Sequence, residues 1–142
     1  MKAVLCKAYG PPDSLVFEDV ASPVPGPGEA VVTVKAASVN FPDVLIIENK
    51  YQVKPPLPFS PGSELAGIVK VVGDGVTHLK PGDRVMAITG YGAFAEEVTV
   101  DARRLLPISI AARPTPPAAP STSSVSPAVN APRSTSANSD VA

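Results

Sequence analysis

The sequence predicts a mainly β fold, a partly open antiparallel barrel with one or two short helices. Three observations predict it: short β-branched runs, turn residues between these runs, and twelve prolines within residues 1–108. So many prolines argue against long helices, because each one removes a backbone donor. In residues 109–142, by contrast, 25 of 34 positions are Ala, Ser, Pro or Thr, too few apolar groups to repay the entropy of ordering. We expect a folded domain over 1–108 and a disordered tail over 109–142.

The expected strands are apolar or β-branched runs bounded by Gly, Pro or Asp. In chain order they cover residues 2–8, 15–20, 31–36, 66–72, 84–88, 94–100 and 103–108. Turn residues separate several of them, at 11–14, 25–28, 73–75 and 81–83. Short strands at this spacing favour a rolled-up antiparallel barrel or a sandwich.

Residues 40–49 break the strand pattern and predict a short helix. Asn40 is an N-cap candidate, Pro42 follows it, and Asp43 stands in the first turn, where an acidic residue is favoured. The proline-rich segment 54–62 comes next and cannot be regular structure. A helix entrance beside a stiff loop could form the wall of a site, or it could be a surface connection that helps to close the barrel.

Charge and hydropathy exclude several classes of partner. Residues 1–108 hold ten basic and twelve acidic side chains, and the tail holds two and one, so neither part is a basic patch for nucleic acid. No apolar run approaches the ~18 residues of a membrane span. The apolar run at the N-terminus is interrupted by Lys7 and is too short for a secretory signal. We therefore expect a cytoplasmic protein without nucleic-acid or membrane partners.

The usual catalytic sets are absent from the sequence. His78 is the only histidine and is expected in an exposed turn, and Cys6 is the only cysteine and is expected to be buried in the first strand. Neither supports a catalytic triad or a cysteine-based zinc site. Residues 90–92 are expected to form a hairpin turn, because strand-like residues follow instead of a helix. Glu96 and Glu97 are expected on opposite strand faces at the surface.

A series of short motifs follows in order along residues 1–108. They are Lys2-Ala3-Val4, Gly10-Pro11-Pro12, Asn40-Phe41-Pro42-Asp43, Pro61-Gly62-Ser63-Glu64-Leu65-Ala66-Gly67, Val71-Val72-Gly73-Asp74-Gly75-Val76, Lys80-Pro81-Gly82-Asp83-Arg84-Val85 and Gly92-Ala93-Phe94-Ala95-Glu96. The series resembles the N-terminal domain of medium-chain dehydrogenases/reductases, and most of all the zinc-free NADPH:quinone oxidoreductases of the zeta-crystallin-like branch. The resemblance implies a GroES-like β-barrel catalytic domain, a separate Rossmann domain, and an active site in the cleft between them.

The resemblance also indicates the branch. Zinc-dependent members carry a cysteine ligand where this chain has Asn40 and a histidine ligand where it has Ser63. Because a catalytic zinc needs three protein ligands, no zinc is expected. Hydride transfer to a quinone needs no Lewis acid, since NADPH is the reductant and the protein supplies position. Leu45 and Ile47 stand where the branch has aromatic and basic residues, which predicts a more apolar cleft.

The same resemblance implies roles for five residues. Asn40 is the expected catalytic residue and, with Asp43, lies near the cofactor; it could bind the nicotinamide carboxamide or the carbonyl of the acceptor. Tyr51 borders the substrate cleft, and Ser63 and Glu64 occupy the former metal-shell positions, where they could bind water or the acceptor. Structural alternatives stay open: a helix cap for Asn40, a dipole partner for Asp43, a loop anchor for Tyr51, and a partner of a basic group for Glu64.

A Rossmann domain is not visible after residue 108. That domain begins with a strand, a glycine-rich turn and a helix, whereas no glycine follows Gly92. We therefore expect a truncated quinone oxidoreductase-like chain with negligible turnover by itself and without the homo-oligomer interface of the family. The tail has the composition of an out-of-frame translation. Two alternatives stay open: an enoyl or alkenal reductase acting on an enone, and a non-enzymatic β-barrel binding module with a disordered tail.

Overall fold

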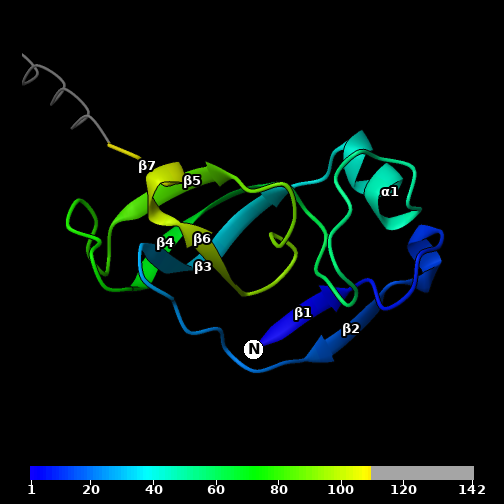
Figure 1. The fold of residues 1–142 in the computed structure, drawn as a ribbon, viewed down its shortest axis with the longest axis horizontal. Helices are drawn as coiled ribbons and strands as arrows, with labels where there is room; N and C mark the ends of the chain where they lie inside the picture. The colour runs from blue at the N-terminus through cyan, green and yellow to red at the C-terminus, as the bar shows by residue number, and fades with distance from the viewer. Residues whose placement is uncertain (110–142) are drawn as a thin grey trace, which may run out of the picture. The chain divides into compact units, whose positions relative to one another are not determined.

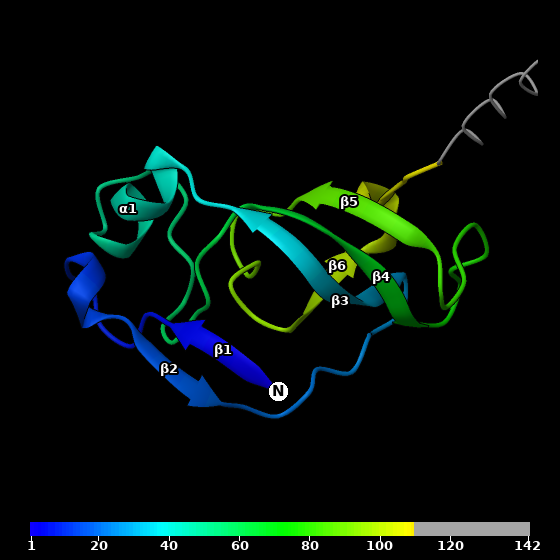
Figure 2. The ribbon, with the colours of Figure 1, turned by 180° about the vertical axis from the view of Figure 1, so that it is seen from behind.

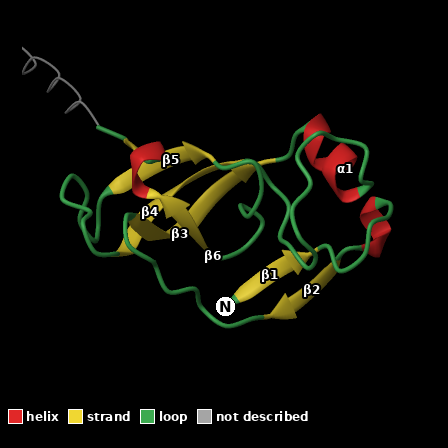
Figure 3. Cartoon of the chain, viewed as in Figure 1, coloured by secondary structure: helices red, strands yellow, loops and turns green. Residues whose placement is uncertain are grey.

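The computed structural model describes residues 1–109, which belong to one unit of the chain. Figure 1 labels the strands and the helix of this part of the chain, and Figure 3 shows its helices, strands and loops in separate colours. The elements are β1 (Lys2–Leu5), a 3-10 turn (Pro12–Ser14), β2 (Val16–Asp19), β3 (Glu29–Ser38), α1 (Phe41–Ile47), β4 (Glu64–Val72), β5 (Arg84–Ile88), β6 (Glu97–Asp101), a second 3-10 turn (Ala102–Arg104) and β7 (Leu106–Pro107).

The strands form two antiparallel sheets. Five of them pair in the order β6-β3-β4-β5-β7, and β1 pairs with β2. Figures 1 and 2, drawn from opposite sides, show the two-stranded sheet facing the larger one across the molecule. Single bridges from Ala3 to Ala95 and from Cys6 to Phe59 connect β1 to loops of the rest of the domain. The sheets do not close, so the predicted mainly β, partly open barrel is confirmed.

The pairing of β3 with β4 holds the centre of the large sheet. Two register shifts interrupt their ladder, and beyond the second one Ser38 stands directly opposite Glu64. The strands approach each other closely at Gly67, where a Cβ would lie 2.3 Å from the backbone oxygen of Thr33. A residue without a side chain is therefore needed at this crossing.

Two groups of buried side chains stabilise the domain. The first core lies inside the large sheet and contains Ala30, Val32, Leu65, Val69, Leu79, Val85, Ala87, Ala93, Val100, Ala102 and Leu105. The second core contains Cys6, Ile46, Ile47 and Phe59. It packs α1 against the end of β1, because the apolar residues of the last helical turn face Cys6 and Phe59. The second core thus anchors the last turn of α1.

Some predicted boundaries were wrong. Residues 94–96 are not a strand; they are held by hydrogen bonds from the Val4 N–H to the Phe94 oxygen and from the Glu96 N–H to the Lys2 oxygen. Residues 103–108 are mostly not a strand either, since the Asp101 side chain accepts from the Arg103 N–H and starts a 3-10 turn before the short β7. The disorder predicted for the tail concerns residues 110–142, which lie outside the described part of the chain.

Two further features concern charged residues and hydropathy. Glu96 is exposed, as predicted, but the Glu97 side chain is only 13% exposed and pairs with Lys70 at 2.6 Å. The prediction that both carboxylates are surface groups was therefore wrong for Glu97, which β6 turns toward β4. Among residues 1–109, no helix is both long enough and apolar enough to cross a membrane.

Candidate functional site

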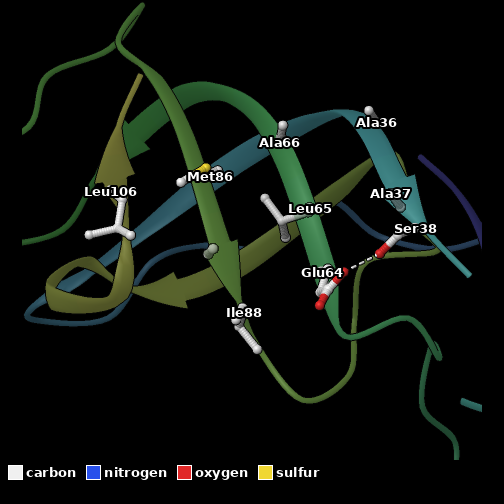
Figure 4. A pocket seen from close by; sticks show the side chains of 10 residues that line it. Ala36, Ala37, Ser38, Glu64, Leu65, Ala66, Met86, Ile88 and Leu106 are labelled. Carbon is white, nitrogen blue, oxygen red and sulfur yellow. Dashed lines mark hydrogen bonds between the residues drawn. The ribbon is translucent and has the colours of Figure 1, made fainter. Parts of the chain in front are cut away.

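A groove of about 500 Å³ lies on the large sheet, and two of its lining residues, Leu65 and Ala87, also belong to the first core. Figure 4 shows it crossing β3, β4, β5 and β7. Its lining is Ala36, Ala37, Ser38, Glu64, Leu65, Ala66, Met86, Ala87, Ile88 and Leu106. The register aligns these side chains in rows: Ser38, Glu64 and Ile88 form one, and Ala36, Ala66 and Met86 the next. We call this surface the apolar groove. A concave apolar surface with few polar groups is typical of a small-molecule site.

Three polar side chains meet at one end of the apolar groove. The Ser38 Oγ donates to Glu64 Oε2 at 2.5 Å, and the Asn40 Nδ2 donates to Ser38 Oγ at 2.9 Å and to Glu64 Oε2 at 3.2 Å. We call these three residues the Asn40 cluster. The hydrogen bond from Ser38, and then that from Asn40, holds the pKa of Glu64 below its ordinary value, because both bonds stabilise the carboxylate. Glu64 therefore stands ionised beside the groove near neutral pH.

The start of α1 positions Asn40 within this cluster. Asn40 is the N-cap, and its backbone N–H donates to Asp43 Oδ2 at 2.7 Å, as in a capping box. Asp43 is only 4% exposed, and its other oxygen, Oδ1, is buried without a hydrogen-bond partner among residues 1–109. Asp43 thus accepts from the backbone of Asn40, whereas the side-chain nitrogen of Asn40 donates to Ser38 and Glu64.

The other predicted site residues lie outside the cluster. Tyr51 packs against the second core, the position of a loop anchor. Ser63 precedes β4, and its backbone oxygen accepts from the Thr89 N–H at 2.7 Å. Ile47 is buried in the second core, and the apolar residues that line the groove come from β3, β4, β5 and β7 and not from α1. The structure therefore brings Asn40 and Glu64 together, holds Asp43 against the backbone of Asn40, and leaves Tyr51 and Ser63 outside the Asn40 cluster.

Ser38 is a site residue that the sequence reasoning missed. It lies two residues before Asn40, at the end of β3, and touches both other members of the cluster. A serine at a strand end carries no distinguishing signal by itself. The signal that could have found it is the antiparallel register that places Ser38 opposite Glu64.

The single cysteine and histidine agree with their predictions. Cys6 is fully buried, and its burial raises the pKa of its thiol. His78 is exposed, with Nε2 at 3.0 Å from the Ala102 oxygen. In residues 1–109 no three His, Cys, Asp or Glu side chains gather where they could hold a metal ion.

Residues 26–110, more than half of the chain, match the family model of the alcohol dehydrogenase GroES-like domain. The chain belongs to this family. The mouse quinone oxidoreductase-like protein 2 is 40% identical over 104 residues, which are 73% of this chain and 29% of that protein. The human synaptic vesicle membrane protein VAT-1 homolog is 38% identical over 102 residues, 70% of this chain and 26% of that protein. The GroES-like chain thus spans less than a third of each of these relatives.

The comparison with solved structures agrees with this family assignment. The quinone oxidoreductase of Escherichia coli, in complex with NADPH, superposes with a TM-score of 0.72 at 32% identity, over 77% of this chain and 33% of that one. These matches confirm the predicted resemblance to the quinone oxidoreductase branch of the medium-chain dehydrogenase/reductase superfamily, at its N-terminal domain. The family is one of oxidoreductases.

Proposed function

We propose that this GroES-like domain forms the acceptor side of a zinc-independent oxidoreductase that transfers hydride from NADPH to a quinone or to a similar activated carbonyl or alkene. The observation that carries the proposal is the apolar groove with the Asn40 cluster at its end. The groove has the volume of a typical small-molecule pocket. The names of the relatives supply the chemistry, since one is a quinone oxidoreductase-like protein and another a quinone oxidoreductase with NADPH.

In this proposal, the residues of this chain bind the acceptor ring and set its orientation. Met86, Ile88 and Leu106 offer exposed apolar surface on which a flat ring can lie with water excluded. The Asn40 cluster offers the polar contacts that fix the orientation of such a ring. NADPH would supply the hydride. The quinone gains that hydride and one proton and becomes the hydroquinone, so no Lewis acid is required of the protein.

Among residues 1–109 there is no turn of the kind that binds the phosphates of the cofactor. Phosphates of dinucleotides sit at a glycine-rich turn between a strand and a helix. In residues 1–109 the only α-helix is α1, and it is entered from β3 through Val39 and Asn40 without a glycine. We therefore propose that the 142-residue polypeptide does not hold NADPH tightly and has negligible turnover by itself.

Two further parts of the proposal concern zinc and location. An amide at Asn40 and a hydroxyl at Ser63 replace the side chains that favour zinc, namely Cys, His and carboxylates, which supports zinc-independent chemistry. Cys6 is buried and is the only cysteine of the chain, so folding does not depend on an intrachain disulfide or on an oxidising compartment. This supports the cytoplasm as the proposed location.

Heteronuclear NMR of the isotope-labelled polypeptide, titrated with duroquinone, tests the groove. Duroquinone is fully methylated and therefore cannot add to a thiol at an open ring position. We expect saturable shifts at the backbone amides of Ser38, Ala66, Met86 and Ile88. Shifts confined to another face, or no saturable shifts, would overturn the proposal. Cinnamaldehyde in the same titration separates an alkenal acceptor from a quinone.

A matched pair of variants sharpens this test. Ile88→Glu places a charge in the groove, whereas Val24→Glu places the same charge on a residue outside it; both parent side chains are exposed, at 66% and 85%. Because burying a carboxylate under an apolar ring costs free energy, Ile88→Glu should weaken duroquinone binding by about tenfold or more. Val24→Glu should leave binding unchanged. Equal effects of the two variants would contradict binding in the groove.

A further inference from the structure

The apolar groove is longer than a single ring. The register sets four side chains opposite one another in a row across β3, β4, β5 and β7, namely Ala36, Ala66, Met86 and Leu106. Neighbouring strands of a sheet lie about 4.8 Å apart, so the three spacings between these strands give the row a length of about 14 Å. A six-membered ring is much shorter than this row, which leaves room for a second group of the ligand in line with the ring.

The two ends of the groove differ in polarity. Where β3 and β4 form it, the row consists of two alanines, and the neighbouring row supplies Ser38 and Glu64. Where β5 and β7 form it, the row consists of Met86 and Leu106, and no polar side chain of residues 1–109 lines it. Figure 4 shows Leu106 at one end and the hydrogen-bonded pair of Ser38 and Glu64 at the other. We call Ser38 and Glu64 the polar end, and Met86 and Leu106 the apolar end.

The apolar end presents hydrocarbon surface to water. Met86 is 49% exposed and Leu106 is 55% exposed, and the two residues stand opposite each other on paired strands. An aliphatic group laid across them removes apolar surface from water on both sides of the contact, which is favourable. The unbranched thioether chain of Met86 can also adjust to a flexible ligand. This end therefore fits an aliphatic chain better than a polar group.

We propose that the apolar groove selects quinones that carry an aliphatic side chain, with the ring at the polar end and the chain laid over the apolar end. The inference rests on the proposed function and narrows its substrate class from quinones in general to alkyl-substituted ones. The ring contacts Ile88, which stands opposite Glu64. The reverse orientation is disfavoured, because a polar group at the apolar end loses water and gains no partner. A chain that extends past Leu106 leaves the groove, since β7 is the last strand of the sheet in residues 1–109.

A homologous series of quinones tests the proposal by NMR titration of the full polypeptide. The series is duroquinone and its homologues in which a propyl, pentyl, heptyl or nonyl chain replaces one methyl group, used below the concentration at which they form micelles. Each added methylene should strengthen binding by about two- to fourfold up to the pentyl homologue. From heptyl to nonyl the change should be about onefold, because the added carbons lie beyond β7 and stay in water. An affinity that rises at a constant rate through the whole series indicates non-specific partition and overturns the proposal.

A matched pair of variants locates the chain. Leu106→Gln replaces apolar surface by an amide of similar size, so it should remove most of the gain from duroquinone to the pentyl homologue. The affinity for duroquinone itself should stay within about threefold of the wild-type value. Leu57→Gln makes the same change at a leucine that is 39% exposed and lies outside the groove, and it should keep the full gain. Equal gains in the wild-type chain and in a folded Leu106→Gln overturn the proposal.

Nuclear Overhauser effects in the wild-type complex with the pentyl homologue need no variant. We expect contacts from the end of the chain to the methyl groups of Met86 and Leu106, and from the ring methyl groups to the methyl group of Ala66. Ring contacts at Leu106 with the chain at the polar end would overturn the proposed orientation. Binding of duroquinone in the groove without any gain from a longer chain overturns the inference and leaves the proposed function standing. Binding of none of the homologues overturns both.

Discussion

Replacing Gly67 by alanine tests whether the close approach of β3 and β4 contributes to the stability of the fold. Gly67 pairs with Val34 across the ladder, three residues beyond Glu64 in β4. Its φ lies outside the left-handed region, so an alanine meets no backbone strain there. The cost comes only from the added methyl group, which makes the change a direct probe of the distance between the two strands.

The magnitude follows from the contacts that the methyl group would make. A Cβ at Gly67 would lie 2.3 Å from the backbone oxygen of Thr33 and 2.6 Å from Val32 Cγ1. Ordinary contacts of carbon lie at about 3.5 Å, so the strands must separate locally by about 1 Å. Overpacking costs about 1–3 kcal/mol, and one weakened ladder hydrogen bond costs about 1 kcal/mol. We expect the free energy of unfolding to fall by about 2–4 kcal/mol.

Urea unfolding followed by far-ultraviolet circular dichroism measures this loss, because the chain has no tryptophan to report by fluorescence. Gly10→Ala is the matched control: its Cβ would lie 2.8 Å from Ser14 Oγ, the end of a side chain that can rotate, so its effect should stay within about 1 kcal/mol. In a thermal scan Gly67→Ala should melt about 10–30 °C lower. If both variants unfold within about 1 kcal/mol of each other, the close approach does not carry the energy assigned to it.

Two further predictions concern ionisable groups. The ion pair with Arg103 lowers the pKa of Asp101 from 3.8 to about 2; because the folded pKa lies below the unfolded one, the pair stabilises the fold above pH ~4 and this contribution is lost as the pH falls from ~4 to ~2. Carboxyl NMR titration should show this value and its return toward 3.8 in Arg103→Gln, and an unchanged pKa would refute the pairing. Burial raises the pKa of the Cys6 thiol, so Ellman's reagent at neutral pH should label the native chain slowly and the urea-unfolded chain rapidly. Rapid labelling of both would show that Cys6 is accessible.

Much of the fold follows from local sequence signals. The β-branched runs at 31–36, 66–72 and 84–88 are confirmed as β3, β4 and β5, and the helix predicted over 40–49 is confirmed as α1. These elements combine β propensity or a capping residue with clear turn signals at their ends. Residues 94–96 were mispredicted, because their backbone bonds reach β1, a partner almost the whole domain away in sequence. Such tertiary contacts leave no local pattern.

The candidate site was predictable only in part. Asn40 and Glu64 were found from motifs, but their contact depends on the register of β3 and β4, which two bulges shift by amounts that the sequence does not show. Ser38 was missed for the same reason. The groove itself depends on rows of side chains from three strands, so a residue such as Ile88 acquires its place only when β5 is paired with β4.

Calorimetric titration of NADPH into the purified 142-residue polypeptide, followed by an assay of NADPH oxidation with duroquinone in the same buffer, tests the central claim most directly. The claim is that this domain provides the acceptor side of the site and that its residues do not hold the nucleotide. The account predicts no saturable heat with NADPH and no oxidation above the rate without protein. Saturable micromolar binding, or turnover at an enzymatic rate, would contradict it.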